Sequence, residues 1–145
     1  EIDHQTSDDF DDLFFRIVIE KIEPWMAEKT HPVLVCDYPP SQSALAKINE
    51  EGWADRFEVY WQGMELANAF HELNDPVEQE LRFHQDLEKR KQLKNEENPP
   101  PIDEELMELM KKGMPPAGGI ALGLERLFMA FAGKSQISQF NLFPF

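Results

Sequence analysis

Residues 118–129 decide the fold of this chain, and they read Gly118-Gly119-Ile120-Ala121-Leu122-Gly123-Leu124-Glu125-Arg126-Leu127-Phe128-Met129. A short apolar run between glycines leads directly into an amphipathic segment, which predicts a strand, a turn and a helix. Arg126 falls in the first turn of that helix, where the helix dipole disfavours a cation. Glycines let backbone N–H groups approach a ligand closely, and a helix N-terminus favours anions. The pattern therefore indicates either a phosphate-binding site or a strand–turn–helix in which Arg126 pairs with a surface carboxylate.

A second stretch predicts a β-hairpin. Two strand-like runs, 56–61 and 64–70, are joined at Gln62-Gly63, and a two-residue turn with glycine is a hairpin signal. This turn places Trp61 opposite Met64.

The same register places Glu58 opposite Ala67 and puts Glu58 and Glu65 on one face of the sheet. Two carboxylates on one face repel each other unless a cation lies between them. Magnesium, which prefers one or two carboxylates together with substrate phosphates, is one such cation. A plain solvated sheet face is the alternative.

The alternation of side chains along the second strand of the hairpin separates residues that we expect to serve one site. A regular strand would turn Asn68, Phe70 and Glu72 away from the face that carries Glu65. For all four to serve one site, the second strand needs a β-bulge near Ala67, because an extra residue re-aims every side chain after it.

The remaining elements follow from caps and periodicity. They are a helix from a capping box at Thr6-Ser7-Asp8-Asp9 to near Pro24, a strand at Val33–Tyr38, a loop or short helix at 41–46, a helix from Asp75 to about Lys94, a helix at 103–112, and an apolar tail at 142–145 that docks on the body. We expect one α+β domain over 1–145, in which helices back an antiparallel sheet.

The composition narrows the function. The 145 residues carry a formal net charge of −14, from 28 acidic and 14 basic residues, which argues against a nucleic-acid surface and fits a cationic ligand or metal ions. The single cysteine, Cys36, excludes an internal disulfide and suggests a reducing compartment. No apolar run has the length of a membrane helix, and no signal peptide is visible. The first residue is Glu1 rather than methionine, so we expect a fragment or a processed product.

The motifs resemble a known family. Arg56-Phe57-Glu58, the run 65–75 and Gly119–Arg126, in this order, look like the C-terminal half of a class II lysyl-tRNA synthetase catalytic domain, with motif 3 at 118–130. The resemblance extends from about Pro32 to the C-terminus.

Three details resemble the elongation factor P lysine ligases, which are paralogues of that synthetase. They are the stretch 40–46, the tripeptide Phe70-His71-Glu72, and Ala121, where true synthetases usually have glycine. The resemblance implies a cytoplasmic enzyme that activates (R)-β-lysine or lysine with ATP and Mg²⁺. It further implies transfer to a lysine of elongation factor P without tRNA, and a homodimer for the full-length enzyme.

Site roles carry over from the resemblance, residue by residue. The resemblance implies that Glu58 and Glu65 hold magnesium on ATP and that the nucleotide also contacts Arg126, Gly123, Leu66 and Asn68. The catalytic set is Arg126, Glu58 and Glu65. The amino acid is bound by Glu72, Asn68, Phe70 and Ala121. In this assignment Glu72 binds the substrate ammonium. The added methyl group of Ala121 either selects between lysine isomers, worth about 1–3 kcal/mol, or is a tolerated change.

Some features depart from the family pattern. Ala69 replaces a usual glycine, and Glu125 stands where aspartate is commoner. No stretch resembles motifs 1 and 2, so we expect about half of an active site. A lysyl-tRNA synthetase fragment and a non-catalytic binding module with the same fold remain as alternatives.

Overall fold

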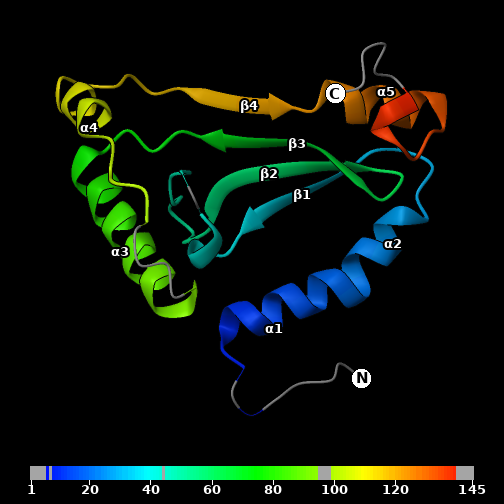
Figure 1. Cartoon of the computed structure of the whole chain (residues 1–145), viewed down its shortest axis with the longest axis horizontal. Helices are drawn as coiled ribbons and strands as arrows, with labels where there is room; N and C mark the ends of the chain where they lie inside the picture. Colours follow the sequence, from blue (N-terminus) through cyan, green and yellow to red (C-terminus); the bar gives the residue numbers. More distant parts are fainter. Residues whose placement is uncertain (1–5, 7, 44, 95–98, 140–145) are drawn as a thin grey trace.

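The computed structural model describes residues 6, 8–43, 45–94 and 99–139, and it confirms the α+β class. Four antiparallel strands form one sheet in the order β1-β2-β3-β4, with helices around it (Figure 1). The strands are β1 (Val33–Tyr38), β2 (Ala54–Trp61), β3 (Met64–His71) and β4 (Gly118–Leu122). The α-helices are α1 (Phe10–Ile17), α2 (Glu23–Ala27), α3 (Pro76–Lys94), α4 (Glu104–Lys111) and α5 (Leu124–Ala132); a π-helix (Val18–Ile22) and 3₁₀ turns at Pro40–Gln42 and Ile137–Gln139 complete them.

The N-terminal helix differs from the prediction at both ends. Asp9, not Thr6, is the N-cap, because its side chain accepts the backbone N–H of Asp12 at 2.9 Å while Asp12 accepts that of Asp9 at 3.1 Å. The helical path also continues beyond Pro24 to Ala27. Proline removes a donor and collides with the carbonyl one turn earlier, and the π-helical turn just before α2 accommodates both effects.

The hairpin confirms the predicted turn and the predicted bulge. Gln62 and Gly63 have φ values of 52° and 74°, as a tight hairpin turn requires, and Trp61 pairs with Met64. The register then shifts, and Leu66 is the extra residue. The predicted pairing of Glu58 with Ala67 is therefore wrong.

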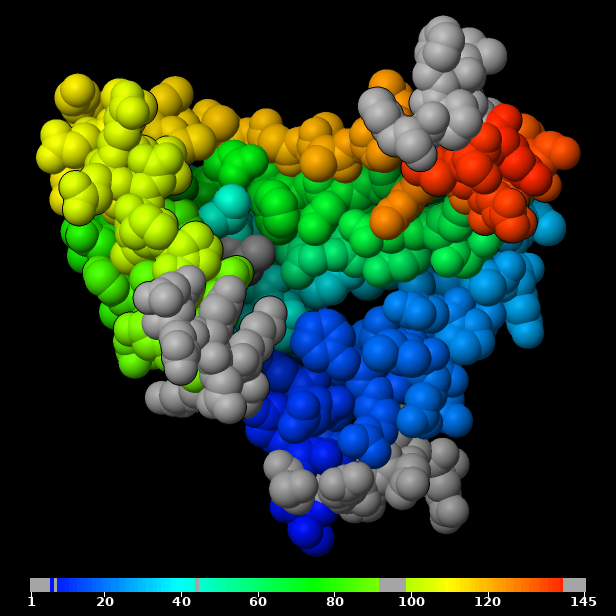
Figure 2. All heavy atoms as spheres, in the orientation of Figure 1, coloured from blue at the N-terminus to red at the C-terminus, as the bar shows by residue number. Residues whose placement is uncertain are grey.

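The helices leave much of the sheet open. Figure 2 shows the strands at the surface between α3–α4 at one end and α5 at the other, with α1–α2 below them. Phe14 of α1 packs edge-on against Tyr38, and Phe131 of α5 packs edge-on against Trp61. Among the described helices, none combines the length and the apolar character that crossing a bilayer requires. The predicted docking of the tail at 142–145 lies outside the described residues, as does Ala44.

Candidate functional site

The β-bulge at Leu66 gathers the predicted site residues on one face of the sheet. Because of it, Glu58 lies opposite Asn68, and Asn68 in turn lies opposite Ala121 of β4. Directly paired residues point to the same side of a sheet, and so do residues two apart along a strand. Glu58, Asn68 and Ala121 therefore form a row across three strands. The predicted residues that share their face are Glu58, Glu65, Asn68, Phe70, Glu72 and Ala121.

Glu58 lies at the centre of a buried hydrogen-bond network. Its Oε2 accepts hydrogen bonds from the hydroxyl groups of Tyr38, at 2.6 Å, and Tyr60, at 2.7 Å. Its Oε1 forms an ion pair with the guanidinium of Arg56. Only 7% of Glu58 is exposed, so this positive partner compensates a charge that would be costly to bury alone. The carboxylate therefore does not need a metal ion for charge compensation.

The same network keeps both tyrosines protonated. Burial raises the pKa of Tyr38 and of Tyr60 far above the ordinary value, and donation to the Glu58 carboxylate raises both pKa values further. Each hydroxyl therefore remains a hydrogen-bond donor that fixes the Glu58 carboxylate.

One end of the face joins the start of β3 to the start of α5. The backbone N–H of Gly123 donates to the carbonyl of Leu66 at 2.9 Å, and Arg126 Nη1 donates to the carbonyl of Glu65 at 2.8 Å. Arg126 Nη1 also lies 3.7 Å from Glu65 Oε2. The Arg126 side chain is 54% exposed, and with Glu65 and Tyr60 it lines a pocket of about 580 Å³.

The other end of the face holds Glu72 against β4. The backbone N–H of Glu72 donates to the carbonyl of Ala117 at 2.9 Å, and Glu72 forms an isolated β-bridge with Ala46. A Cβ atom added to Gly119 would lie only 2.1 Å from Glu72 Oε1. The glycine thus provides the space that the Glu72 carboxylate occupies.

The predicted residues form an extended site. Glu65 and Glu72 are separated by seven positions of a bulged strand, roughly 20 Å at about 3.3 Å per residue. The arrangement suits a long ligand with an anionic end near Arg126 and a cationic end near Glu72.

Glu58 and Glu65 can supply only part of the coordination that a magnesium ion needs. A carboxylate offers about four lone-pair positions, and protein donors occupy three of those on Glu58, which leaves one on Oε1. Glu65, with a side chain 38% exposed, is more accessible. The described residues contain no group of three or more His, Cys, Asp or Glu side chains placed so that they could hold a metal ion. A bound magnesium would therefore depend on substrate phosphates and water for most of its ligands.

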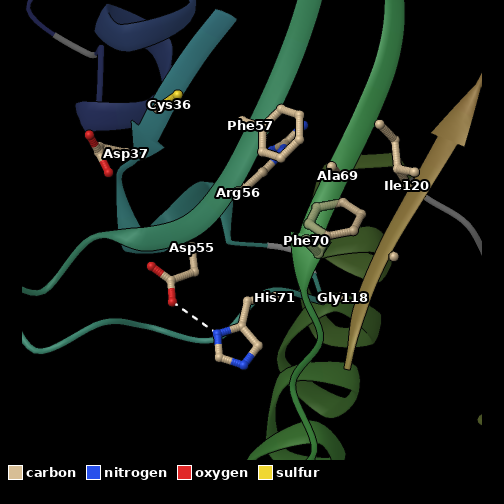
Figure 3. Close-up of a pocket in the computed structure, with 11 residues that line it drawn as sticks. Cys36, Asp37, Asp55, Arg56, Phe57, Ala69, Phe70, His71, Gly118 and Ile120 are labelled. Atoms are coloured by element: carbon tan, nitrogen blue, oxygen red, sulfur yellow. Dashed lines mark hydrogen bonds and ion pairs between the residues drawn. The ribbon is translucent and has the colours of Figure 1, made fainter. Parts of the chain in front are cut away.

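The opposite face of the sheet carries a separate hollow of about 530 Å³. Figure 3 shows Phe57, Ala69 and Ile120 side by side on three strands, with a hydrogen-bond contact between Asp55 Oδ2 and His71 Nδ1 at 3.2 Å. Of the predicted site residues, only Phe70 also lines this hollow. It is therefore distinct from the face described above.

Four residues that shape the site have no role in the sequence-based prediction: Tyr38, Arg56, Tyr60 and Gly119. The sequence does contain a signal for Arg56 and Tyr60, because they lie two residues before and two residues after Glu58 and therefore share its face of the strand. Tyr38 lies 20 positions away from Glu58, and no local pattern connects them.

Comparisons with known proteins identify the family of the chain. Residues 7–145 match the family described as tRNA synthetases class II (D, K and N). The chain is 49% identical over 116 residues to an elongation factor P–(R)-β-lysine ligase of Vibrio parahaemolyticus, covering 79% of this chain and 35% of the relative. It is 43% identical over 143 residues to the Vibrio cholerae ligase of the same name, covering 97% of this chain and 43% of the relative. A lysine–tRNA ligase of Dehalococcoides mccartyi is 41% identical over 138 residues, covering 94% of this chain and 27% of the relative. The chain thus spans between about a quarter and two fifths of these relatives.

Proposed function

We propose that this chain, which belongs to the class II tRNA synthetases (D, K and N), forms part of an ATP-dependent lysine ligase. The protein would activate (R)-β-lysine or lysine as an adenylate and transfer the acyl group to a lysine of elongation factor P, independently of tRNA. The observation that carries the proposal is the bulge at Leu66, which puts Glu58, Glu65 and Glu72 on one face. Relatives named elongation factor P–(R)-β-lysine ligase support the choice of substrate and acceptor.

The end of the site near Arg126 suits the ATP phosphates. Half of the Arg126 side chain is exposed, and its one hydrogen bond to Glu65 leaves other N–H donors for phosphate oxygens. In our proposal Gly123 and the backbone at Leu66, joined by their hydrogen bond, let the nucleotide approach the main chain closely. Asn68 would contribute a side-chain amide between the two ends.

Glu58 and Glu65 would hold magnesium together with the phosphates. When bound, the ion supplies positive charge that stabilises the pyrophosphate leaving group. Glu65 is the more accessible ligand, while Glu58 contributes through its remaining lone pair. The two tyrosines and Arg56 keep that carboxylate in a fixed orientation.

The end near Glu72 suits an amino acid with a terminal ammonium group. A carboxylate is the natural partner for an ammonium in a partly dry pocket. Phe70 would form an apolar wall for the aliphatic chain, and Ala121, opposite Asn68, would limit the space beside it. The added methyl of Ala121 would favour (R)-β-lysine over lysine.

The chemistry needs no protein nucleophile. The substrate carboxylate attacks the α-phosphorus of ATP, an adenylate forms, and pyrophosphate leaves. The amino group of the acceptor lysine then attacks the acyl carbon, an amide forms, AMP leaves and one proton is released. The contribution of the protein is positioning and electrostatic stabilisation.

Transfer to tRNA is the second candidate. The Dehalococcoides mccartyi lysine–tRNA ligase, 41% identical over 94% of this chain, favours it. The acidic balance of the chain favours a protein acceptor, since tRNA binding needs clustered basic residues. We further propose a homodimeric, cytoplasmic full-length enzyme.

A label-transfer experiment tests the proposal. The full-length protein that carries this chain is incubated with ATP, Mg²⁺ and labelled (R)-β-lysine or lysine, together with elongation factor P or tRNA. We expect label on elongation factor P, more from (R)-β-lysine. Label on tRNA alone would establish the second candidate, and label on neither acceptor would favour a non-catalytic binding module.

A further inference from the structure

Arg56 connects parts of the site that are far apart in the sequence. Its Nη2 pairs with Glu58 Oε1, its Nη1 donates to the carbonyl of Gln42 at 2.7 Å, and its Nε donates to Asn68 Oδ1 at 3.3 Å. These partners belong to β2, to the 3₁₀ turn at Pro40–Gln42, and to β3. One guanidinium thus joins a proposed magnesium ligand to a proposed substrate-binding residue.

Two aromatic rings hold the same guanidinium in place. The Cζ atom of Arg56 lies 4.4 Å from the ring centroid of Tyr38 and 5.6 Å from that of Phe70. Cation–π contacts of this kind restrict a planar guanidinium more than they would a lysine ammonium. With only 14% of the side chain exposed, Arg56 is a fixed element of this face rather than a mobile surface cation.

The contact with Asn68 determines how that amide is presented. Arginine has only donors, so the Asn68 oxygen must face Arg56, and the orientation of the amide follows. The Nδ2 group of Asn68 has no hydrogen-bond partner among the described residues. Asn68 therefore offers donors, and not an acceptor, to whatever binds beside it.

We infer that Arg56 is a positioning residue that sets Glu58, Asn68 and Phe70 relative to one another, and so couples the ATP end of the site to the amino-acid end. This inference rests on the proposed function. Arg56 itself does not contact the substrates in this account. Its planar fork serves three acceptors at once, which the single ammonium of a lysine cannot reproduce.

Arg82 provides a matched control. Its side chain is 15% exposed, it pairs with Glu78 at 2.9 Å, and it donates to Ser43 Oγ at 3.0 Å and to the carbonyl of Ala46 at 2.7 Å. It is as buried as Arg56 and holds the neighbouring part of the same loop, but none of these contacts is with a proposed site residue.

The test compares Arg56→Lys with Arg82→Lys in the full-length protein, by lysine-dependent ATP–pyrophosphate exchange. We expect Arg56→Lys to raise the KM for lysine and the KM for ATP together and to lower kcat/KM about 100-fold, because the ligand groups at both ends lose their geometry. Arg82→Lys should leave both KM values near those of the wild type. A loss of folded protein alone would lower the apparent kcat and leave both KM values unchanged.

A double-mutant cycle with Asn68→Ala tests the coupling directly. Asn68→Ala should cost about tenfold less in the Arg56→Lys background than in the wild type, whereas independent residues would give additive losses. Additive losses, or KM values for Arg56→Lys equal to those for Arg82→Lys, would overturn the inference.

Asn68→Asp tests the orientation of the amide without altering Arg56. Aspartate keeps an acceptor for Arg56 but replaces the free donor with an oxygen, so activity should fall as far as in Asn68→Ala. Activity retained in Asn68→Asp would also overturn the inference. Absence of exchange in the wild-type protein would instead refute the proposed function, so the two failures are distinguishable.

Discussion

Replacing Gly119 with alanine should move the Glu72 carboxylate and leave the fold intact. The new Cβ would lie 2.1 Å from Glu72 Oε1 and 3.3 Å from its Cδ, whereas ordinary van der Waals contact begins at 3.4 Å. The Glu72 backbone is fixed by its hydrogen bond to Ala117, so the side chain must give way. The atom that clashes is the far end of a flexible side chain, and we therefore expect little change in the free energy of unfolding.

The size of the functional effect follows from that displacement. The carboxylate oxygen must move by at least about 1.3 Å, the difference between the clash distance and ordinary contact. A misplacement of about 1 Å costs on the order of 10²-fold in activity, or about 2.7 kcal/mol at 1.36 kcal/mol per factor of ten. Because Glu72 is proposed to bind the ammonium group, the loss should appear in kcat/KM for lysine, while the KM for ATP stays unchanged.

The assay is lysine-dependent ATP–pyrophosphate exchange in the full-length protein, with thermal melts of each variant. Gly118→Ala is the matched control, since its Cβ would meet only the carbonyl of Phe70 at 3.6 Å, an ordinary contact. The effect of Gly119→Ala should also disappear in a Glu72→Ala background. A Gly119→Ala enzyme with the same lysine kinetics as Gly118→Ala would refute the reasoning.

Three further predictions concern the same face. Glu65→Ala should abolish lysine-dependent exchange, because Glu65 is the more accessible of the two proposed metal ligands; near-normal exchange would remove it from the metal site. Ala121→Gly should shift the kcat/KM ratio from (R)-β-lysine toward lysine by a factor that corresponds to about 1–3 kcal/mol, and an unchanged ratio would count against the pocket argument. The raised pKa values of Tyr38 and Tyr60 mean that the folded state retains protons that the unfolded state loses above about pH 10. The two tyrosines should therefore contribute fully to the free energy of unfolding below that pH. Above it, their contribution should fall by at most about 1.4 kcal/mol per pH unit for each tyrosine. Urea denaturation at pH 9 and pH 11 would measure the difference. A Tyr38→Phe, Tyr60→Phe variant that loses as much stability over this range as the wild type would exclude the two hydroxyl groups as the cause.

The hairpin shows how far local rules reach. The position of the turn follows from Gly63, because a two-residue hairpin turn needs positive φ and glycine adopts it without strain; Gln62 adopts positive φ without being a residue type that favours it. The bulge followed from a conflict: Glu65 and Asn68 could serve one face only if the strand contained an extra residue. Its position at Leu66, and with it the pairing of Glu58 with Asn68, required the three-dimensional register.

The charge balance around Glu58 shows where local rules end. Two carboxylates on one face indicated a cation between them, and magnesium was the predicted one. In the structure, Arg56 compensates Glu58, and Arg126 lies beside Glu65. Tertiary packing decides which cation lies beside a carboxylate, and the spacing of residues in the sequence does not predict that cation. Both interpretations of Arg126 thus remain compatible: it contacts Glu65 here and is exposed enough to bind phosphate.

The N-terminal helix shows a third limit. The stop expected at Pro24 is a sound rule for an α-helix, because proline cannot donate and its ring collides with the preceding turn. The chain meets this constraint with one π-helical turn, after which Glu23–Ala27 continues as a helix. Such turns have no reliable pattern in a single sequence.

Amino-acid-dependent ATP–pyrophosphate exchange in the full-length protein tests whether this face of the sheet binds ATP and a lysine. We expect (R)-β-lysine and lysine each to support exchange, and an analogue without the terminal ammonium not to support it, since Glu72 would lose its partner. Exchange that is equally fast with the analogue, or absent with both lysines, would contradict the claim that this face of the sheet binds ATP and an ammonium-bearing amino acid.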